Sequence, residues 1–406
     1  MKLLIGPGLS DPKGDEAFLV KALRKVADVK TFDSGIKDFE QLVRSVPHGW
    51  TPDAIVIRDA EYYKMPSGLE RAELPIFGLI GDYNLSYNQM LPVLGCFDHF
   101  FCDSKGVRIF KKLGFNNCEF FCLYGFDPEV HHPYPSKKEW DVVFIGNLNA
   151  AVQQDREEYL YQLATLSGNY RIHIDTLIFG SEYASMLSKS HLVFNRSIRD
   201  EVNMRFFEAI GCGSVVMNNH LSELDELGLV PDQHYLVFDD VQATVVRYFK
   251  EWSAAERDRI RENAKQVMHE HTYDRRAQDL VKKIQTTRID ISKRRFAGLA
   301  EKERKKRWIR YRCDEVDVPG LGRWHRYDPT MVGWQKHLTR NELEIRSLDF
   351  NMWFWWMDLL AASGLHSYLA QFMMERQSLL SSFGCYRDVA NTLRERLNIL
   401  LYGFTA

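Results

Sequence analysis

Apolar runs alternate with amphipathic segments along the first third of the chain. Residues 2–5 form a short apolar run, and residues 15–26 place apolar side chains at helical spacing. Further apolar runs follow at residues 29–32, 54–57, 76–80, 97–102 and 119–123. Apolar strands that alternate with amphipathic helices are typical of a mostly parallel sheet that helices cover on both faces. We therefore predict an α/β domain over residues 1–136.

A second series of the same kind follows a stretch rich in proline and polar residues at 131–138, which has the composition of a linker. His131 and His132 lie in this linker, and we expect both to be exposed. The apolar runs of the second series lie at residues 141–145, 171–174, 191–195, 214–217 and 235–238, with helical patterns at 156–166, 182–187 and 203–210. The pattern predicts two Rossmann-like domains in tandem, the second over residues 137–288. Ligands of such domains bind at the carboxyl ends of the strands and in the cleft between paired domains.

The composition changes near residue 288. Residues 288–312 contain eleven Lys or Arg against three acidic residues, and six of the nine Trp lie beyond residue 300. We predict that residues 289–406 form a basic, then aromatic-rich, helical extension. Its basic part is either a surface for an anionic acceptor, such as lipid headgroups, an anionic polymer or DNA, or a solvated helix that bridges back to the first domain.

Charge and cysteine content narrow the function classes. Lys and Arg number 53 against 55 acidic residues in 406, so the whole molecule is not a polycation that coats nucleic acid. Seven scattered cysteines are too few for a disulfide framework, and the N-terminal apolar run breaks at Gly6 and Pro7, unlike a secretory signal. We expect a cytoplasmic protein. Residues 350–374 carry only the charge of Asp358, and we expect them to form a buried helical pair, an oligomer interface or a peripheral membrane anchor rather than a span.

The most informative segment is residues 195–213, which lies between two apolar strands. It places seven charged or polar residues at a predicted strand-to-helix turn: Arg196, Arg199, Asp200, Glu201, Asn203, Arg205 and Glu208. Backbone N–H groups at such a turn favour anions, arginines bind diphosphates bidentately, and a glutamate can accept two hydrogen bonds from a ribose diol. The segment therefore fits a nucleotide-sugar. The alternative is a solvated helix start in which Glu208 pairs with an arginine.

A second candidate is the loop after the predicted strand 141–145. Gly146 and Asn147 would let the backbone approach a pyrophosphate, and Arg156 is expected at the start of the next helix. The alternative is an ordinary turn with a surface arginine. The glycines at positions 6 and 8 lack the third glycine of a dinucleotide fingerprint, because position 11 is Asp, which excludes NAD there.

Residues 1–288 resemble the GT-B glycosyltransferases, and most closely the spore-maturation CgeB-like group within the group 1 glycosyltransferases. Four ordered segments carry the resemblance: 124–127 with Pro133, 141–147, 203–209 with Gly211 and Gly213, and 271–273 with Arg276. The resemblance implies a hexosyltransferase-like enzyme that moves a sugar from a nucleotide-sugar donor, bound by the second domain, to an unidentified hydroxyl acceptor, presented by the first. The acceptor is a glycan, a protein or a nucleic acid.

The resemblance also implies roles for acidic residues. GT-B enzymes carry an acid, seven intervening residues and a Glu, and Asp200 with Glu208 meets that spacing, although the first acid is Asp with Glu201 beside it. Glu208 is the expected ribose ligand. Asp82 ends a predicted strand of the first domain and, with Asp200, is a catalytic candidate for handling the acceptor proton, the alternative for Asp82 being a helix cap. The expected donor-binding residues are Gly146, Asn147, Arg156, Arg196, Arg199, Asn203, Arg205 and Glu208.

No metal or cofactor is expected besides the nucleotide-sugar. Cys118 and Cys122 lack metal-ligand spacing and are expected to be buried apolar groups, and arginines with a helix N-terminus can stabilise a leaving diphosphate. Two alternative functions remain. One is the same fold acting on modified DNA bases, and the other is a non-catalytic carbohydrate-binding or partner-binding protein on a GT-B frame.

Overall fold

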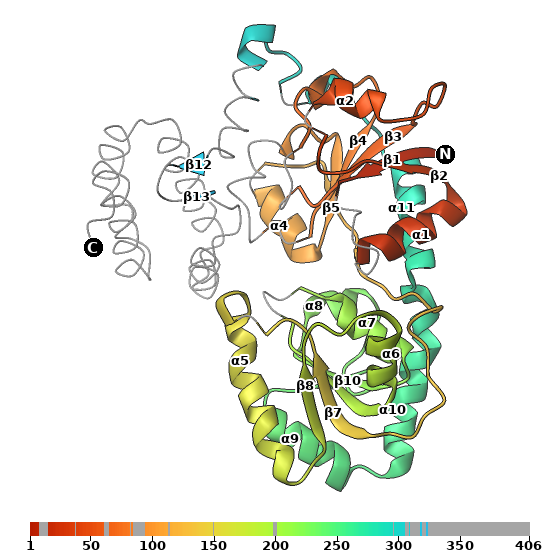
Figure 1. Cartoon of the computed structure of the whole chain (residues 1–406), viewed down its shortest axis with the longest axis vertical. Helices are drawn as coiled ribbons and strands as arrows, with labels where there is room; N and C mark the ends of the chain where they lie inside the picture. Colours follow the sequence, from red (N-terminus) through yellow and green to blue (C-terminus); the bar gives the residue numbers. More distant parts are fainter. Residues whose placement is uncertain are drawn as a thin grey trace, which may run out of the picture.

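The structure is a computed structural model in which two α/β domains lie one above the other (Figure 1). It describes residues 1–7, 15–36, 38–60, 65–81, 83, 94–112, 114–148, 150–197, 201–294, 296–304, 308, 317–318 and 322–323.

The first domain is built on a parallel sheet with the strand order β2-β1-β3-β4-β5-β6. Its strands are β1 Lys2–Gly6, β2 Asp28–Thr31, β3 Ala54–Arg58, β4 Ile76–Leu79, β5 His99–Cys102 and β6 Cys118–Phe120. Its helices are α1 Asp15–Val26, α2 Phe39–Arg44 and α4 Ser104–Lys112, with a 3₁₀ turn at Leu69–Arg71. Asp38 caps α2 by accepting a hydrogen bond from the Gln41 N–H, which fixes the residue at which this helix begins.

The second domain has a parallel sheet with the order β11-β10-β9-β7-β8. Its strands are β7 Trp140–Ile145, β8 Ile172–Asp175, β9 Ser190–Asn195, β10 Val215–Asn218 and β11 Leu236–Val237. Its helices are α5 Ala150–Ala164, α6 Gly180–Ser188, α7 Met204–Gly211, α8 Ser222–Glu226, α9 Val241–Val246 and α10 Ala254–Val267, and a π-helical turn follows α9 at Arg247–Glu251. A capping box of Ser253 and Glu256 starts α10.

Both faces of each sheet are buried. In β1, Leu4 packs into one core cluster while its neighbours Leu3 and Ile5 pack into another. In β7, Val143 and Phe144 point to opposite faces in the same way. Successive side chains of a strand alternate between faces, so a strand covered on both sides must be apolar at every position. This explains the continuous apolar runs and confirms the predicted α/β class with two tandem parallel sheets.

The chain crosses between the two domains in two segments that lie side by side. Phe126 forms a parallel bridge with Thr272, its N–H donates to the His271 carbonyl oxygen over 3.3 Å, and its carbonyl oxygen accepts from the Tyr273 N–H over 3.0 Å. A Cβ at Gly125 would lie 2.7 Å from the His271 carbonyl oxygen, so only glycine allows this approach. We call residues 123–127 and 271–273 the double crossing.

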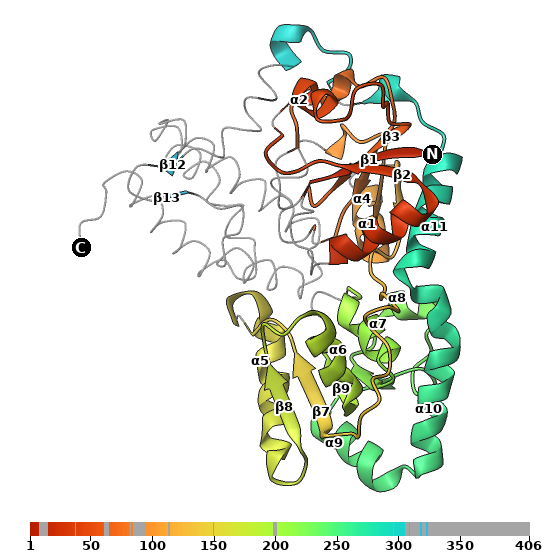
Figure 2. The same ribbon diagram turned by 45° about the vertical axis from the view of Figure 1, so that its right-hand side comes forward.

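After the double crossing the chain returns to the first domain. Helix α11, Tyr273–Thr286, packs along α1, and its Ala277 and Leu280 share a core cluster with Leu23. Figure 2 shows α10 beside the second domain and α11 beside the first, along one side of the molecule. The predicted domain boundaries at 136 and 288 stay predictions.

The start of the basic stretch is anchored rather than solvated. The Arg294 side chain is fully buried and forms an ion pair of 2.6 Å with the buried Asp98. It also donates to the carbonyl oxygens of Ala72 and Leu74. Trp308 Nε1–H donates to Glu70 Oε2 over 2.7 Å. The expectation of a solvated helix is therefore wrong at these positions, although the return to the first domain is as predicted.

The aromatic segment 350–374 lies outside the described residues. Within the part of the chain that the structure describes, no helix has the length and apolar character needed to cross a bilayer.

Replacing Arg294 tests this anchor. Arg294→Ala leaves the buried Asp98 without its cation, and removing one partner of a buried ion pair costs about 3–5 kcal/mol. We expect the urea unfolding transition of the first domain to lose stability of that order. The matched control is Lys293→Ala, because the Lys293 side chain is 82% exposed. Equal effects of the two substitutions would contradict the anchoring role of Arg294.

Candidate functional site

Arg205 sits at the carboxyl edge of the second sheet. It belongs to the first turn of α7, and its Nε–H donates to the Ile145 carbonyl oxygen over 2.8 Å at the end of β7. One Nη donates to Asn195 Oδ1 over 2.9 Å at the end of β9. The guanidinium lies 4.7 Å from the centroid of the Phe144 ring. A Cβ at Gly146 would collide with the other Nη, so this glycine makes room for the guanidinium.

Two further arginines join the loops around Arg205. Arg156 is buried and donates to the carbonyl oxygens of Asn147 and Arg196, over 3.1 and 3.2 Å, so it ties the loop after β7 to the loop after β9. The Arg196 guanidinium lies 5.2 Å from the Tyr159 ring centroid. Helix α5 begins at Ala150, so Arg156 lies in its second turn and not at its start as predicted. We call Arg156, Arg196 and Arg205 the arginine cluster.

Asparagines that the sequence reasoning missed hold this edge together. Asn195 Nδ2–H donates to Asn218 Oδ1 over 2.8 Å, and both residues are fully buried. Asn219 Oδ1 accepts from the Ser197 N–H over 2.9 Å. Asn195 and Asn218 are the last residues of otherwise apolar strands, and that position was the available signal, because the carboxyl ends of parallel strands meet at one edge.

The arginine cluster is short of negative charge. Among the described residues, the side-chain hydrogen bonds of Arg196 and Arg205 go to uncharged oxygens, namely the Ser197 and Ile145 carbonyl oxygens and Asn195 Oδ1. Arg196 Nε is buried without a hydrogen-bond partner. Helix α7 starts at Asn203 with no side-chain capping hydrogen bond, although Asn203 Nδ2–H donates to Ser197 Oγ over 3.4 Å. Unpaired guanidinium groups beside an uncapped helix N-terminus favour an anion.

Three of the predicted site residues are not described. Asp82, Arg199 and Asp200 lie outside the described residues, so their roles stay predictions. The structure brings the predicted residues Gly146, Asn147, Arg156, Arg196, Asn203 and Arg205 together at one edge of the second sheet.

Glu208 is held between the buried side chain of His131 and the partly buried side chain of Tyr183. It is 5% exposed, Tyr183 Oη–H donates to its Oε2 over 3.0 Å, and His131 Nε2 lies 3.4 Å from its Oε1. The Asp127 N–H donates to His131 Nδ1, so the proton of the neutral ring is on Nε2 and points to the carboxylate. The predicted exposure of His131 is wrong, since His131 is 3% exposed, whereas His132 is exposed as expected.

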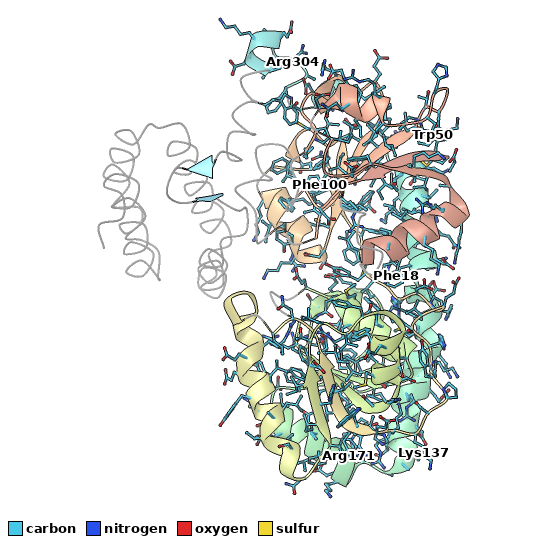
Figure 3. The ribbon with its side chains drawn as sticks, viewed as in Figure 1. Phe18, Trp50, Phe100, Lys137, Arg171 and Arg304 are labelled. Atoms are coloured by element: carbon cyan, nitrogen blue, oxygen red, sulfur yellow. The ribbon has the colours of Figure 1, made fainter. Side chains whose placement is uncertain are left out.

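Packing from both domains buries His131. The Phe18 ring of α1 meets it edge-on at 5.5 Å, and the Tyr183 ring of α6 meets it at 6.3 Å. Figure 3 shows Phe18 on the side of the first domain that faces the second. Burial lowers the pKa of His131 to about 4. Burial, with the nearby Glu208 carboxylate, raises the pKa of Tyr183 well above its usual value, so the phenol remains a hydrogen-bond donor.

Several residues that carry the family resemblance meet at the double crossing. A Cβ at Gly211 would lie 2.6 Å from the Phe126 ring, and Gly213, with φ +78°, lies against Pro133. Arg276 Nε–H donates to the Tyr124 carbonyl oxygen over 2.9 Å. These residues therefore build the connection between the domains, and Arg205 is the one residue of the arginine cluster that belongs to the same four segments.

A pocket lies between the facing edges of the two sheets. Its lining comes from the first domain and from the segments before α7 and around α8 of the second: Ile80, Gly81, Asp103, Phe121, Leu123, Tyr124, Glu201, Val202 and Glu223. Burial, and next the charge of Asp103, raises the pKa of Glu223 to about 9. Burial also raises the pKa of Asp103 to about 6, against the hydrogen bond that it accepts from the Gly106 N–H. None of the described lining residues is basic.

Cys118 and Cys122 were predicted to be buried apolar groups and not metal ligands. Cys118 and Cys122 are each 4% exposed, as expected for buried apolar groups, and burial raises the pKa of both thiols. Across the described ranges, no three His, Cys, Asp or Glu side chains are placed to hold a metal ion. Metal independence stays a prediction.

Comparison with known protein families gives one match. Residues 131–282 match the family model described as glycosyl transferase-like. A search of curated proteins found no match to the sequence.

Solved structures share the two-domain fold. A structure described as trehalose-6-phosphate from E. coli bound with UDP-2-fluoro glucose has a TM-score of 0.51 and 11% identity, covering 71% of this chain and 100% of that chain. HepE from Anabaena in complex with UDP and glucose has a TM-score of 0.50 and 12% identity, covering 70% and 99%. The fold is that of the GT-B glycosyltransferases, as the sequence resemblance implies.

Titration of His131 tests the arrangement around Glu208. A histidine with a pKa lowered to about 4 stays neutral in the folded protein, whereas the unfolded chain takes up a proton near pH 6.5. Unfolding free energy should therefore fall by about 3 kcal/mol as the pH drops from 6.5 to 4. Nitrogen-15 NMR, with His131→Asn for assignment, should show the Nε2-protonated ring at pH 6. A ring that is protonated on both nitrogens at that pH would contradict this arrangement.

Proposed function

We propose that this protein is a glycosyltransferase that moves a sugar from a nucleotide-sugar donor to a hydroxyl acceptor. The observation that carries the proposal is the arginine cluster. Its Arg196 and Arg205 lack carboxylate partners within the described residues and lie where the strands of a GT-B donor domain end. Half-buried guanidinium groups that contact only uncharged oxygens at that edge match the diphosphate of an activated sugar.

Each residue has a role in this proposal. Arg196, Arg205 and the N-terminus of α7 would hold the diphosphate, and Arg156 would keep the two surrounding loops in register. Glu208 is the proposed ribose ligand, as the sequence resemblance implies, and Tyr183 and His131 would orient its carboxylate. The other predicted contacts, Gly146, Asn147, Arg199 and Asn203, complete the proposed donor site.

The chemistry follows from charge. As the acceptor oxygen bonds to the anomeric carbon, the bond from that carbon to the diphosphate breaks, and the leaving group gains negative charge. Guanidinium groups and helix N–H groups stabilise this charge, and no step of the proposal requires a metal. The acceptor proton needs a base, for which Asp82 and Asp200 remain the proposed residues. Closure of the two domains would exclude water, which otherwise hydrolyses the donor.

The alternatives receive less support. A DNA acceptor was suggested by the basic stretch, but its Arg294 is buried against Asp98 and does not face a ligand. A purely binding role does not explain why the unpaired arginines lie at the donor edge. The CgeB-like subgroup and hexosyl specificity belong to the proposal and rest on the sequence resemblance.

Loss of Arg205 tests the donor site. Arg205→Ala removes a charge-assisted contact of the diphosphate, and such contacts contribute about 1.5–3 kcal/mol. We expect calorimetry to show UDP affinity about 10-fold to 150-fold weaker than in the wild type. Arg171→Ala is the matched control, because Arg171 pairs with Asp141 at the far end of the second domain (Figure 3) and should bind UDP normally.

The converse results are also informative. Unchanged UDP affinity in folded Arg205→Ala would overturn the assignment of the arginine cluster. Absence of nucleotide binding and of nucleotide-sugar hydrolysis by the wild type would overturn the proposed function itself.

A further inference from the structure

Helix α1 of the first domain holds a short turn at residues 127–131, where the chain enters the second domain. Lys21 Nζ donates to Asp127 Oδ2 over 2.7 Å, and the Asp127 side chain is buried. The Phe18 ring meets the His131 ring edge-on at 5.5 Å. The His131 N–H donates to the Asp127 carbonyl oxygen over 2.7 Å and closes the turn. Both ends of the turn are therefore fixed to α1.

The same turn reaches the carboxylate of Glu208 on its other side. The Asp127 N–H donates to His131 Nδ1 over 3.3 Å, so the ring proton lies on Nε2, which is 3.4 Å from Glu208 Oε1. Tyr183 Oη–H donates to the other carboxylate oxygen over 3.0 Å. A continuous series of contacts thus leads from α1, through the 127–131 turn, to Glu208 in α7 of the second domain.

Helix α1 also contacts the returning segment of the double crossing. The Phe18 ring stacks on the Tyr273 ring at 5.7 Å, with 23° between the ring planes. One side chain of the first domain therefore touches both segments that join the domains, at His131 and at Tyr273. The position of α1 relative to the double crossing determines where the His131 ring lies, and through it where the Glu208 carboxylate is held.

Holding a glutamate in place has a cost that packing alone does not explain. Asp127, His131 and Glu208 are all buried polar side chains, and apolar residues at such positions generally contribute at least as much to stability. A flexible glutamate, however, loses rotamer entropy whenever a ligand fixes it. A carboxylate that the protein already holds binds its ligand without that loss, which is the advantage of a preorganised site.

We propose that helix α1 positions Glu208 for the ribose of the donor, acting through the turn at residues 127–131. Phe18 and Lys21 are thus positioning residues that lie in the first domain, whereas Glu208 and the arginine cluster lie in the second. The inference rests on the proposed function, because it needs Glu208 to be the ribose ligand. It adds that recognition of the donor nucleoside depends on the domain that does not hold it.

The dependence acts in both directions. Coupling between two sites is reciprocal, so a ribose that binds Glu208 in this orientation also stabilises the contact between His131 and Phe18. Donor binding would therefore favour the present arrangement of α1 against the double crossing. The contacts of the diphosphate with the arginine cluster involve no residue of α1, so only the ribose should show this dependence.

Two nucleotides that differ only in the ribose hydroxyls test the inference. Calorimetry on the full chain would compare UDP with its dideoxy analogue, which lacks both hydroxyl groups. A hydrogen bond to a charged group contributes enough for the wild type to bind UDP about 10-fold to 150-fold more tightly than the analogue. In Phe18→Ala we expect this ratio to fall by about 5-fold or more, with affinity for the analogue near that of the wild type.

Further variants separate positioning from stability. His131→Ala should lose the ratio as Phe18→Ala does, whereas His131→Gln should retain most of it, because its amide is also a neutral N–H donor. Arg24→Ala, at an exposed position on α1, is the matched control and should keep the wild-type ratio. Partial unfolding weakens the apparent affinity for both nucleotides by the same factor, so the ratio remains valid in a destabilised variant.

The possible results fall on different parts of the argument. A wild-type ratio in Phe18→Ala, or equal weakening of both nucleotides there, would overturn the role of α1. Wild-type protein that binds both nucleotides equally would overturn the ribose role of Glu208 and this inference with it, while its UDP binding would still support the arginine cluster. Absence of UDP binding by the wild type would overturn the proposed function itself.

Discussion

The hydrogen bond from Arg205 to the last carbonyl oxygen of β7 is the contact around which the candidate site is organised. It fixes a guanidinium between two strand ends and the first turn of α7, and it needs Gly146 to have no side chain. The buried asparagines behind it satisfy one another, so the strand ends hold their positions without a carboxylate near the arginines. Because no carboxylate of the described residues neutralises Arg196 or Arg205, the positive charge is left for a ligand. The proposed donor site and its leaving-group chemistry both depend on that imbalance.

The two sides of the cleft have opposite electrostatic character. The second domain presents guanidinium groups at the ends of β7 and β9, whereas the pocket beside the segment Glu201–Asn203 contains carboxyl groups from both domains. Glu208 belongs to neither set, since it is buried against His131 and Tyr183 and links α7 to the linker between the domains.

Much of the fold could be predicted from the sequence, because strands buried on both faces must be apolar at every position. The limits of β3 and α1 agree closely with the apolar patterns for that reason. The location of the arginine cluster near the strand ends could also be predicted from the sequence. Charged residues directly after an apolar strand seldom contribute to the core, so they indicate a ligand site. The burial of His131 was not, because a linker composition says nothing about Phe18 and Tyr183 closing over it from distant helices. The raised pKa of Glu223 could not be predicted from the sequence either. It depends in part on Asp103, which lies 120 positions earlier in the chain and in the other domain.

The double crossing makes the second domain an insertion, with both of its ends held by the first. The chain leaves through Phe126 and comes back through Thr272 and Tyr273, and the helix that follows is packed on α1. Two crossing segments that lie side by side would allow the domains to rotate about the direction of the segments. They would resist twisting of one domain against the other and separation of the two domains. Cutting one of them would leave the lobes joined by the other. Because backbone hydrogen bonds pair the two crossing segments, they join the domains as one connection and not as two independent tethers.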